Sequence, residues 1–146
     1  MGMTDTMTEI SALLEHRSEA IRSKDLERLM SFYSDDIVYF DLVPPLLYAG
    51  SDALRGRFAD WFGRWAGPIG QEISDLHIEA GGDVAAVHML IRTSGTLATG
   101  REVGYWVRAS DTLRRADGAW SITHEHVSLP VEFPSGTAAM DLLPPA

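Results

Sequence analysis

The sequence predicts an α+β domain in which helices come first and a long antiparallel sheet follows. Apolar residues recur at helical spacing through much of residues 4–65, interrupted by a short run of strand character. From residue 69 onward, four long segments of strand character are separated by Gly81-Gly82, Thr99-Gly100 and Asp117-Gly118, pairs that are typical of tight turns. Strands joined by such short turns pair antiparallel, so this part of the chain predicts a meander.

The first helix is predicted over residues 4–23, and its apolar residues fall on one stripe: Ile10, Leu13, Leu14 and Ile21. Arg17 lies in the middle of that stripe, where another aliphatic residue would be expected. Two interpretations remain open. The arginine stem packs while its head reaches water, or the guanidinium enters a polar cavity, where it requires a partner. Residues 26–33 predict a second, short helix.

Residues 37–42 (IVYFDL) predict a strand in which Tyr39 and Asp41 share a face. Aspartate is depleted in strands, so Asp41 either ends the strand facing water or has a function. After Pro44-Pro45, Gly50-Ser51 predicts the start of a third helix, with Ser51 as its N-cap. The apolar face of this helix is aromatic, and we expect core packing with one or two rings lining a cavity: Leu54, Phe58, Trp61, Phe62 and Trp65.

The last predicted strand, residues 119–130 (AWSITHEHVSLP), organises the predicted site. Alternation places five of its side chains on one face: Trp120, Ile122, His124, His126 and Ser128. A face that begins with large apolar groups and continues with two imidazoles predicts a passage from the core into a cavity. We therefore interpret this strand and its partner, residues 101–115, as the back wall of a pocket. The alternative is that both histidines are core residues that bond a carbonyl or Glu125.

Composition excludes several classes of function. The chain has 146 residues, enough for one domain, and its net charge of -9 argues against nucleic acid and against anionic membrane surfaces. It contains no cysteine, which excludes thiolate chemistry and fits a reducing cytoplasm. Residues 1–8 lack the basic and apolar regions of a secretory signal, and no apolar run reaches membrane-spanning length. We expect a cytoplasmic protein with one domain over residues 1–133 and a loosely ordered tail over residues 134–146.

The order of helix, helix, strand, helix and meander resembles the nuclear transport factor 2-like (NTF2-like) superfamily. The segment KDLERLMSFYSDDIVYFDLVPPLLYAGSDALRGRFADWF looks like its ketosteroid isomerase and SnoaL-type cyclase branch, and the ending WVRASDTLRRADGAWSITHEHVSLP is similar to the SnoaL-like group. The resemblance implies a cone, with three N-terminal helices packed in the concave face of a strongly curved, mostly antiparallel sheet. It also implies a homodimer formed through the convex face, where we expect Ala86, His88, Leu90, Tyr105, Val107 and Ala109.

The resemblance carries over to individual residues with several departures. Asp41 stands where the isomerases keep their general base, although Leu42 and Val43 intervene before the prolines. Arg17 stands where they place an oxyanion-binding tyrosine. Ser110, with Asp111 beside it, is the approximate counterpart of their protonated aspartate. The limonene epoxide hydrolase branch has a tyrosine-x-asparagine pair on its first strand and an arginine-x-aspartate pair on a later one. Tyr39-x-Asp41 and Arg108-x-Ser110 resemble these pairs, with one substitution in each.

These observations predict a cofactor-independent isomerase or cyclase that transfers a proton next to the carbonyl of a small molecule. The expected catalytic residues are Asp41, His124, His126 and Arg108. The expected ligand contacts are Arg17, Tyr39, Tyr48, Trp61, Trp106, Ser110 and Ile122. Arginines also favour a carboxylate-bearing ligand. The alternatives are a non-catalytic ligand-binding or dimerisation module and an epoxide hydrolase using Tyr39, Asp41 and Arg108. We expect no cofactor and no metal, because two histidines without a third ligand make an incomplete site.

Overall fold

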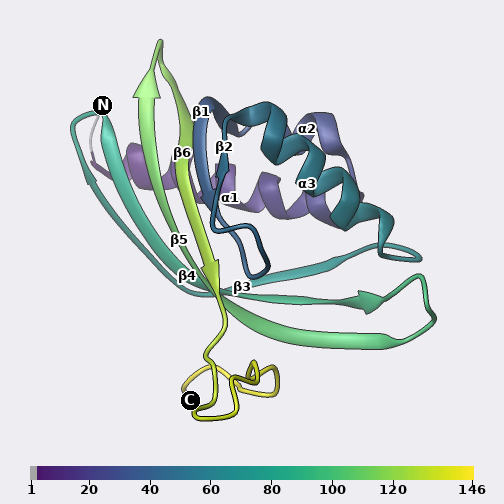
Figure 1. The fold of residues 1–146 in the computed structure, drawn as a ribbon. Helices are drawn as coiled ribbons and strands as arrows, with labels where there is room; N and C mark the ends of the chain where they lie inside the picture. Colours follow the sequence, from purple (N-terminus) through teal and green to yellow (C-terminus); the bar gives the residue numbers. More distant parts are fainter. Residues whose placement is uncertain (1–2) are drawn as a thin grey trace.

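Helices and strands follow each other in the predicted order in the computed structural model, which describes residues 3–146 (Figure 1). Within these residues the helices are α1 (Met3–Arg22), α2 (Leu26–Met30) and α3 (Ser51–Gly63). The strands are β1 (Tyr33–Phe40), β2 (Tyr48–Ala49), β3 (Gly70–Gly81), β4 (Val84–Thr96), β5 (Glu102–Ala116) and β6 (Ala119–Ser128). The predicted α+β class is confirmed.

The strands form one sheet in the order β2-β1-β6-β5-β4-β3, and it curves around the helices (Figure 1). Strands β3 to β6 make the predicted antiparallel meander, and β1 adds to β6 in parallel. Two local predictions differ from the structure. Tyr33 opens β1 instead of ending α2, and the short β2 beside β1 was not predicted. The cap of α3 also moves by one residue, because Gly50, with φ of 91°, is the N-cap.

The concave face holds the core. The apolar stripe of α1 lies against the sheet, with Ile10 and Leu14 fully buried. Helix α3 adds Leu54, Phe58 and Phe62, which are buried as the aromatic pattern predicted. Each large apolar side chain removed from water contributes about 1.5–3 kcal/mol to folding. This packing fixes α1 against β3 and β6 and α3 against β1. The polar residues described below lie on the inner faces of β1, β5 and β6.

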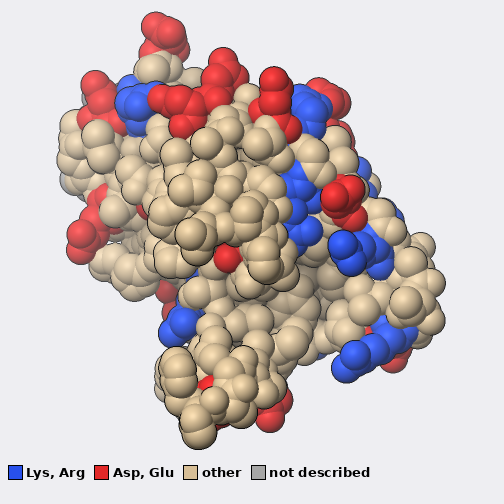
Figure 2. Space-filling model, viewed as in Figure 1, with Lys and Arg blue, Asp and Glu red and all other residues tan. Residues whose placement is uncertain are grey.

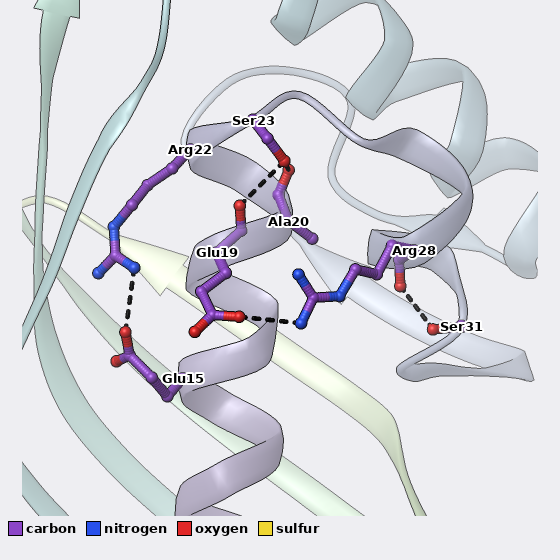
Figure 3. Close-up of polar contacts among 7 residues, drawn as sticks. All are labelled: Glu15, Glu19, Ala20, Arg22, Ser23, Arg28 and Ser31. Carbon is purple, nitrogen blue, oxygen red and sulfur yellow. Dashed lines mark hydrogen bonds and ion pairs between the residues drawn. The ribbon is translucent and has the colours of Figure 1, made fainter.

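The outer surface of α1 carries ion pairs that contrast with the interior. Arg22 Nη1 lies 3.0 Å from Glu15 Oε1, and Arg28 Nη2 of α2 lies 2.9 Å from Glu19 Oε2 (Figure 3). These side chains are 39% to 53% exposed, so water screens both pairs and each stabilises the fold little.

The C-terminal segment after β6 has local structure of its own. Val131 and Ala138 form a β-bridge, and the backbone N–H of Ala139 donates to the carbonyl of Pro130. Ala139 is buried, whereas Phe133 and Leu143 are exposed.

Candidate functional site

Asp41 follows the end of β1 and is held in place by two donors. Its Oδ2 lies 2.5 Å from Nε of Arg57 on α3, and its Oδ1 accepts a hydrogen bond from the backbone N–H of Leu42 at 2.6 Å. The carboxylate side chain is only 7% exposed. The interpretation in which Asp41 faces bulk water is therefore wrong. Its partner is Arg57, which the sequence analysis did not identify, and neither Arg17 nor Arg108 is hydrogen-bonded to it among residues 3–146.

Phenols surround the Asp41–Arg57 pair. Tyr48 of β2 is the register partner of Tyr39 of β1, so the two side chains share the concave face with Asp41. Burial raises the pKa of Tyr105 on β5, and this ring feels the charges of both Arg57 and Asp41. Burial also raises the pKa of Tyr39 well above its ordinary value, so both tyrosines are neutral hydrogen-bond donors. We call Tyr39, Asp41, Tyr48, Arg57 and Tyr105 the mouth cluster.

Deeper in the cone, Arg17 enters a polar site and forms a buried ion pair. Its Nη2 lies 2.8 Å from Oε1 of Glu125 on β6, and its Nε donates to the hydroxyl of Tyr33 at 2.8 Å. The Tyr33 hydroxyl in turn donates to the same Glu125 oxygen at 2.7 Å. Arg17 is 4% exposed and Glu125 is fully buried, which excludes the interpretation of an arginine head in water. Burial lowers the pKa of Arg17, but the charge of Glu125, together with smaller contributions from Tyr33, Asp111 and Tyr39, raises this pKa overall.

Asp111 completes this inner cluster, which consists of Arg17, Tyr33, Asp111 and Glu125. Asp111 on β5 is the register partner of Glu125, and Glu125 is the register partner of Tyr39, so the three residues form one row across β5, β6 and β1. Burial and the neighbouring Glu125 charge raise the pKa of Asp111 well above its ordinary value. The pKa of Glu125 is raised by burial, but Arg17 and the hydrogen bonds from Asp111 and Tyr33 lower it overall. We therefore describe Asp111 as the acid and Glu125 as the carboxylate of the pair.

Several polar atoms of the inner cluster have no partner. Both oxygens of Asp111, Oε2 of Glu125 and Nη1 of Arg17 are fully buried, and apart from a proton shared between the two carboxyls they have no hydrogen-bond partner among the described residues. A proton kept on Asp111 supplies one donor, toward Glu125. The Nη1 group of Arg17 and one oxygen of Asp111 remain open to water or to a ligand. Unpaired buried polar groups are costly, so their concentration at one place indicates a functional site.

The two histidines of the final strand lie on the other face of the sheet, which corrects the predicted orientation. Thr112 pairs with His124, but the next residue of β5, Leu113, pairs with Ile122. Thr123 is therefore an extra residue, a β-bulge, and it reverses the alternation for the rest of the strand. As a result Glu125 and Val127 point inward, whereas His124 and His126 face outward. Nδ1 of His124 lies 2.7 Å from the carbonyl oxygen of Val38, to which it donates.

The outward histidines are part of a shallow hollow on the convex face. His77, His88, Ser110 and His126 occupy one row across β3 to β6, and the rings of His77 and His88 stack at 4.9 Å. The hollow has a volume of about 290 Å³, and His77, His88 and His124 line it. No group of three or more His, Asp or Glu side chains within the described residues is arranged to hold a metal ion.

Three further predicted contacts also lie on the convex face: Trp106, Arg108 and Ser110. Pairing of β4 with β5 runs without a break from Val84–Arg114 to Thr96–Glu102, so strict alternation fixes their orientation. Nε of Arg108 donates to Ser128 Oγ at 3.1 Å on the outer surface, so Tyr39, Asp41 and Arg108 cannot form one pocket. Tyr105, Val107 and Ala109 face inward instead, contrary to the predicted dimer face. Ile122 also faces inward but is fully buried in the core.

A pH titration of stability tests the protonated state of Asp111. The folded chain keeps a proton on Asp111 at pH values where the unfolded chain, with a pKa of about 3.9, has lost it. The resulting stabilisation is complete below that pKa and is lost as pH rises toward the folded pKa. Asp111→Asn imitates the protonated acid, so we expect its free energy of unfolding to fall less than that of the parent between about pH 5 and pH 8.

Urea unfolding at several pH values measures this difference. Asp60→Asn, at an exposed position of α3, is the matched control and should follow the parent. Parallel curves for the parent and Asp111→Asn would show that Asp111 is ionised in the folded protein.

The fold and the two clusters define a class: a curved α+β cone with acidic and basic groups on its inner face. The family model of the SnoaL-like domain matches residues 10–132, and the chain belongs to this family, within the NTF2-like superfamily. An NTF2-like protein of unknown function from Pseudomonas putida is 32% identical, with a TM-score of 0.89 over 97% of this chain and 98% of that one.

Other solved structures share the fold at lower identity. A suggested dehydratase of the NTF2-like family from Streptomyces avermitilis is 21% identical, with a TM-score of 0.77 over 88% of this chain and 99% of that one. A protein of unknown function from Mycobacterium tuberculosis is 20% identical, with a TM-score of 0.79 over 94% and 84%. None of the curated proteins that were compared matches the sequence. No helix within residues 3–146 combines the length and apolar character needed to cross a bilayer.

Proposed function

We propose that this protein is a cofactor-independent enzyme that transfers a proton next to the carbonyl group of a small molecule, as an isomerase or cyclase. One observation carries the proposal: Asp111 is buried on the concave face, without a donor for either oxygen, and its pKa is raised well above the ordinary value. An acid kept neutral in an apolar site is suited to donate a hydrogen bond to an oxygen that gains charge during a reaction.

The proposed substrate lies between the inner cluster and the mouth cluster. Asp41 stands two residues beyond Tyr39 on the same face, and this step along a strand covers about 7 Å. The corresponding position on β5, two residues from Asp111, is Ala109, whose side chain is small. Phe58 packs against both Tyr39 and Trp61, and these rings provide flat apolar walls. A cyclic or planar molecule fits this arrangement.

The proposed reaction divides the roles between the clusters. Asp41 accepts the proton from the carbon next to the carbonyl, and the electrons of that C–H bond move onto the carbonyl oxygen to form an enolate. Tyr39 donates a hydrogen bond to this oxygen, Asp111 turns its single O–H from Glu125 to the same oxygen, and the free Nη1 of Arg17 contributes a positive charge. Return of the proton to a different carbon completes an isomerisation, whereas attack of the enolate carbon on a second carbonyl completes a cyclisation.

We also propose that two copies pair through the convex face, in a cytoplasmic homodimer. The apolar residues that support this are fewer than the sequence suggested, because Tyr105, Val107 and Ala109 face inward. Leu90 and Trp106 are half-buried on the outer face of the single chain. Pairing through this face would remove both side chains from water, which supports the proposal.

The isomerisation of cyclohex-3-enone to the conjugated cyclohex-2-enone tests the proposed function. The reaction moves one proton next to a carbonyl, and the product absorbs strongly in the ultraviolet. We expect the protein to accelerate it above the buffer rate, and in D₂O to place deuterium at C4 of the product, the carbon that receives the proton, as seen by ¹H NMR. A rate equal to buffer in both assays contradicts proton transfer at a ketone.

Dehydration is the second candidate, and the protonated state of Asp111 favours it. The same acid can give its proton to a leaving hydroxyl while Asp41 removes a proton from the neighbouring carbon. Two solved structures of this fold, from Streptomyces avermitilis and Novosphingobium aromaticivorans, have suggested dehydratase activities. With 3-hydroxycyclohexanone as substrate, loss of water gives cyclohex-2-enone. Both reactions give this product, so the substrate from which it forms shows which reaction the protein catalyses.

A further inference from the structure

We infer that the substrate carries a carboxylate group and that Arg57, held by Asp41, binds it at the mouth of the cone. This inference rests on the proposed function, because it places the substrate in the same site. It adds a recognition residue and a substrate class: planar or cyclic carbonyl compounds that are also acids.

The first step of the argument is the hydrogen bonding of Arg57. A guanidinium has five N–H donors in a fixed plane. Nε of Arg57 donates to Asp41 Oδ2 at 2.5 Å, but among residues 3–146 no acceptor is hydrogen-bonded to its Nη1 or Nη2. The side chain is 15% exposed and its terminal nitrogens are not among the fully buried atoms, so a ligand can reach these donors. Two parallel N–H groups fit the two oxygens of a carboxylate.

A purely structural role explains only part of this geometry. The bond from Arg57 to Asp41 joins α3 to the end of β1, and it stabilises that contact. Such a clamp uses Nε alone. It does not account for the two remaining nitrogens, which share the mouth cluster with Tyr39 and Tyr48, both of which interact electrostatically with the guanidinium. The clamp also sets the direction of the guanidinium plane, since the Nε–H points at Asp41.

The second step is the distribution of charge around the mouth. Several Lys and Arg side chains lie on the right of Figure 2, where α3 and the tip of the β4–β5 hairpin lie, with a few acidic side chains among them, and most Asp and Glu in this view lie along the upper edge. The backbone N–H of Ala98 in the hairpin donates to the carbonyl of Arg64 at 2.7 Å, so the hairpin tip joins the end of α3. Arg64 and Arg101 are both exposed in this region. In a chain of net charge -9, such a local excess of arginine attracts small anions.

The third step is the shape of the neighbouring surface. The rings of Trp61 and Trp65 meet edge to face at 6.3 Å, and Trp61 is half-buried beside Phe58. An acid bound to Arg57 therefore places its carbon skeleton against aromatic faces, with its carbonyl end directed toward Asp111. This arrangement favours a flat ring that bears a ketone at one end and a carboxylate at the other.

Binding of 4-acetylbenzoate and its neutral analogue 4-acetylbenzamide tests the inference, with calorimetry or saturation-transfer NMR as the measurement. The two molecules differ only in charge at one end. We expect the parent protein to prefer the carboxylate by about tenfold or more, as one charge-assisted hydrogen-bond pair predicts. Arg57→Gln should abolish this preference. Arg55→Gln is the matched control, because Arg55 lies on the exposed side of the same helix and pairs with Glu27.

Each outcome has a defined meaning. Equal affinity for the two ligands, no binding of either, or a preference that persists in Arg57→Gln would overturn the inference. If Arg57→Gln and Arg55→Gln both lose the preference, the preference comes from the general charge of α3. This outcome would also overturn the inference. A carboxylate preference without any deuterium exchange at the acetyl group would leave the inference standing while contradicting the proposed function. Deuterium exchange at the acetyl group of both ligands at equal rates, with equal affinities, would leave the proposed function standing and contradict the inference.

Discussion

Arg17→Met is expected to lower the free energy of unfolding by about 3–5 kcal/mol, the cost of leaving one member of a buried ion pair without its partner. Arg17 is 4% exposed and supplies a charge and one of two hydrogen bonds to Glu125 Oε1. Methionine has a similar volume and preserves the packing of α1, so the loss reports the charge and not a cavity. Urea or thermal unfolding followed by circular dichroism measures the change.

Two further variants make this prediction decisive. Arg28→Met removes the exposed partner of Glu19 and should leave the unfolding midpoint unchanged within error. The double variant Arg17→Met/Glu125→Gln removes both charges and should recover part of the lost stability, because no uncompensated charge remains. A single variant as stable as the parent, or a double variant no better than the single, would show that Glu125 is not ionised in the folded protein.

Asp41→Asn is expected to reduce the rate of cyclohex-3-enone isomerisation by about 10²- to 10⁴-fold, the usual contribution of a general base. Asparagine keeps the size of the side chain, and its amide oxygen can still accept from Arg57, although its NH₂ group cannot accept from Leu42. Affinity for 4-acetylbenzoate should therefore change little while turnover is lost. The initial rate at saturating ketone measures this effect.

Asp60→Asn is the matched control for this variant. Asp60 lies on α3, like Arg57, but it is exposed, so its replacement should not alter the rate. If Asp41→Asn retains the parent rate, the base is another group and Asp41 serves only to hold Arg57. If the affinity falls as far as the rate, Asp41 contributes to binding and not to the chemical step.

The fold was predictable because its signals are local. Helical spacing in α1 and α3 and the glycine turns between β3, β4, β5 and β6 each depend on a few neighbouring residues. Pairing of β1 with β6 depends on packing between distant segments, which no local pattern specifies, so it was not predicted. The short β2 consists of two residues, too few for any periodicity.

The site was predictable only in part, and the reason lies in single residues. Asp41 and Arg17 were singled out because each is unusual for its place in a strand or stripe, and Tyr39 because it shares a strand face with Asp41. Glu125 was missed because Thr123 reverses the alternation, and nothing in the sequence around Thr123 distinguishes a bulge from a regular strand. Arg57 was detectable in principle, since it lies one helical turn before Trp61 and next to Phe58, at the border of the aromatic face.

The bulge at Thr123 determines which ionisable side chains of β6 face the interior of the cone. With the extra residue, β6 offers a carboxylate to the interior and two imidazoles to the outside. Removing Thr123 would leave regular alternation with both sets in place, because His124 would then follow Ile122 directly on the outer face. Taking Thr123 into a regular strand would instead exchange the two sets. Related proteins can therefore change the reagents inside the cone by gaining or losing this bulge, without any substitution among the reagents themselves, and an alignment without gaps to a relative that has no bulge will equate residues that point in opposite directions.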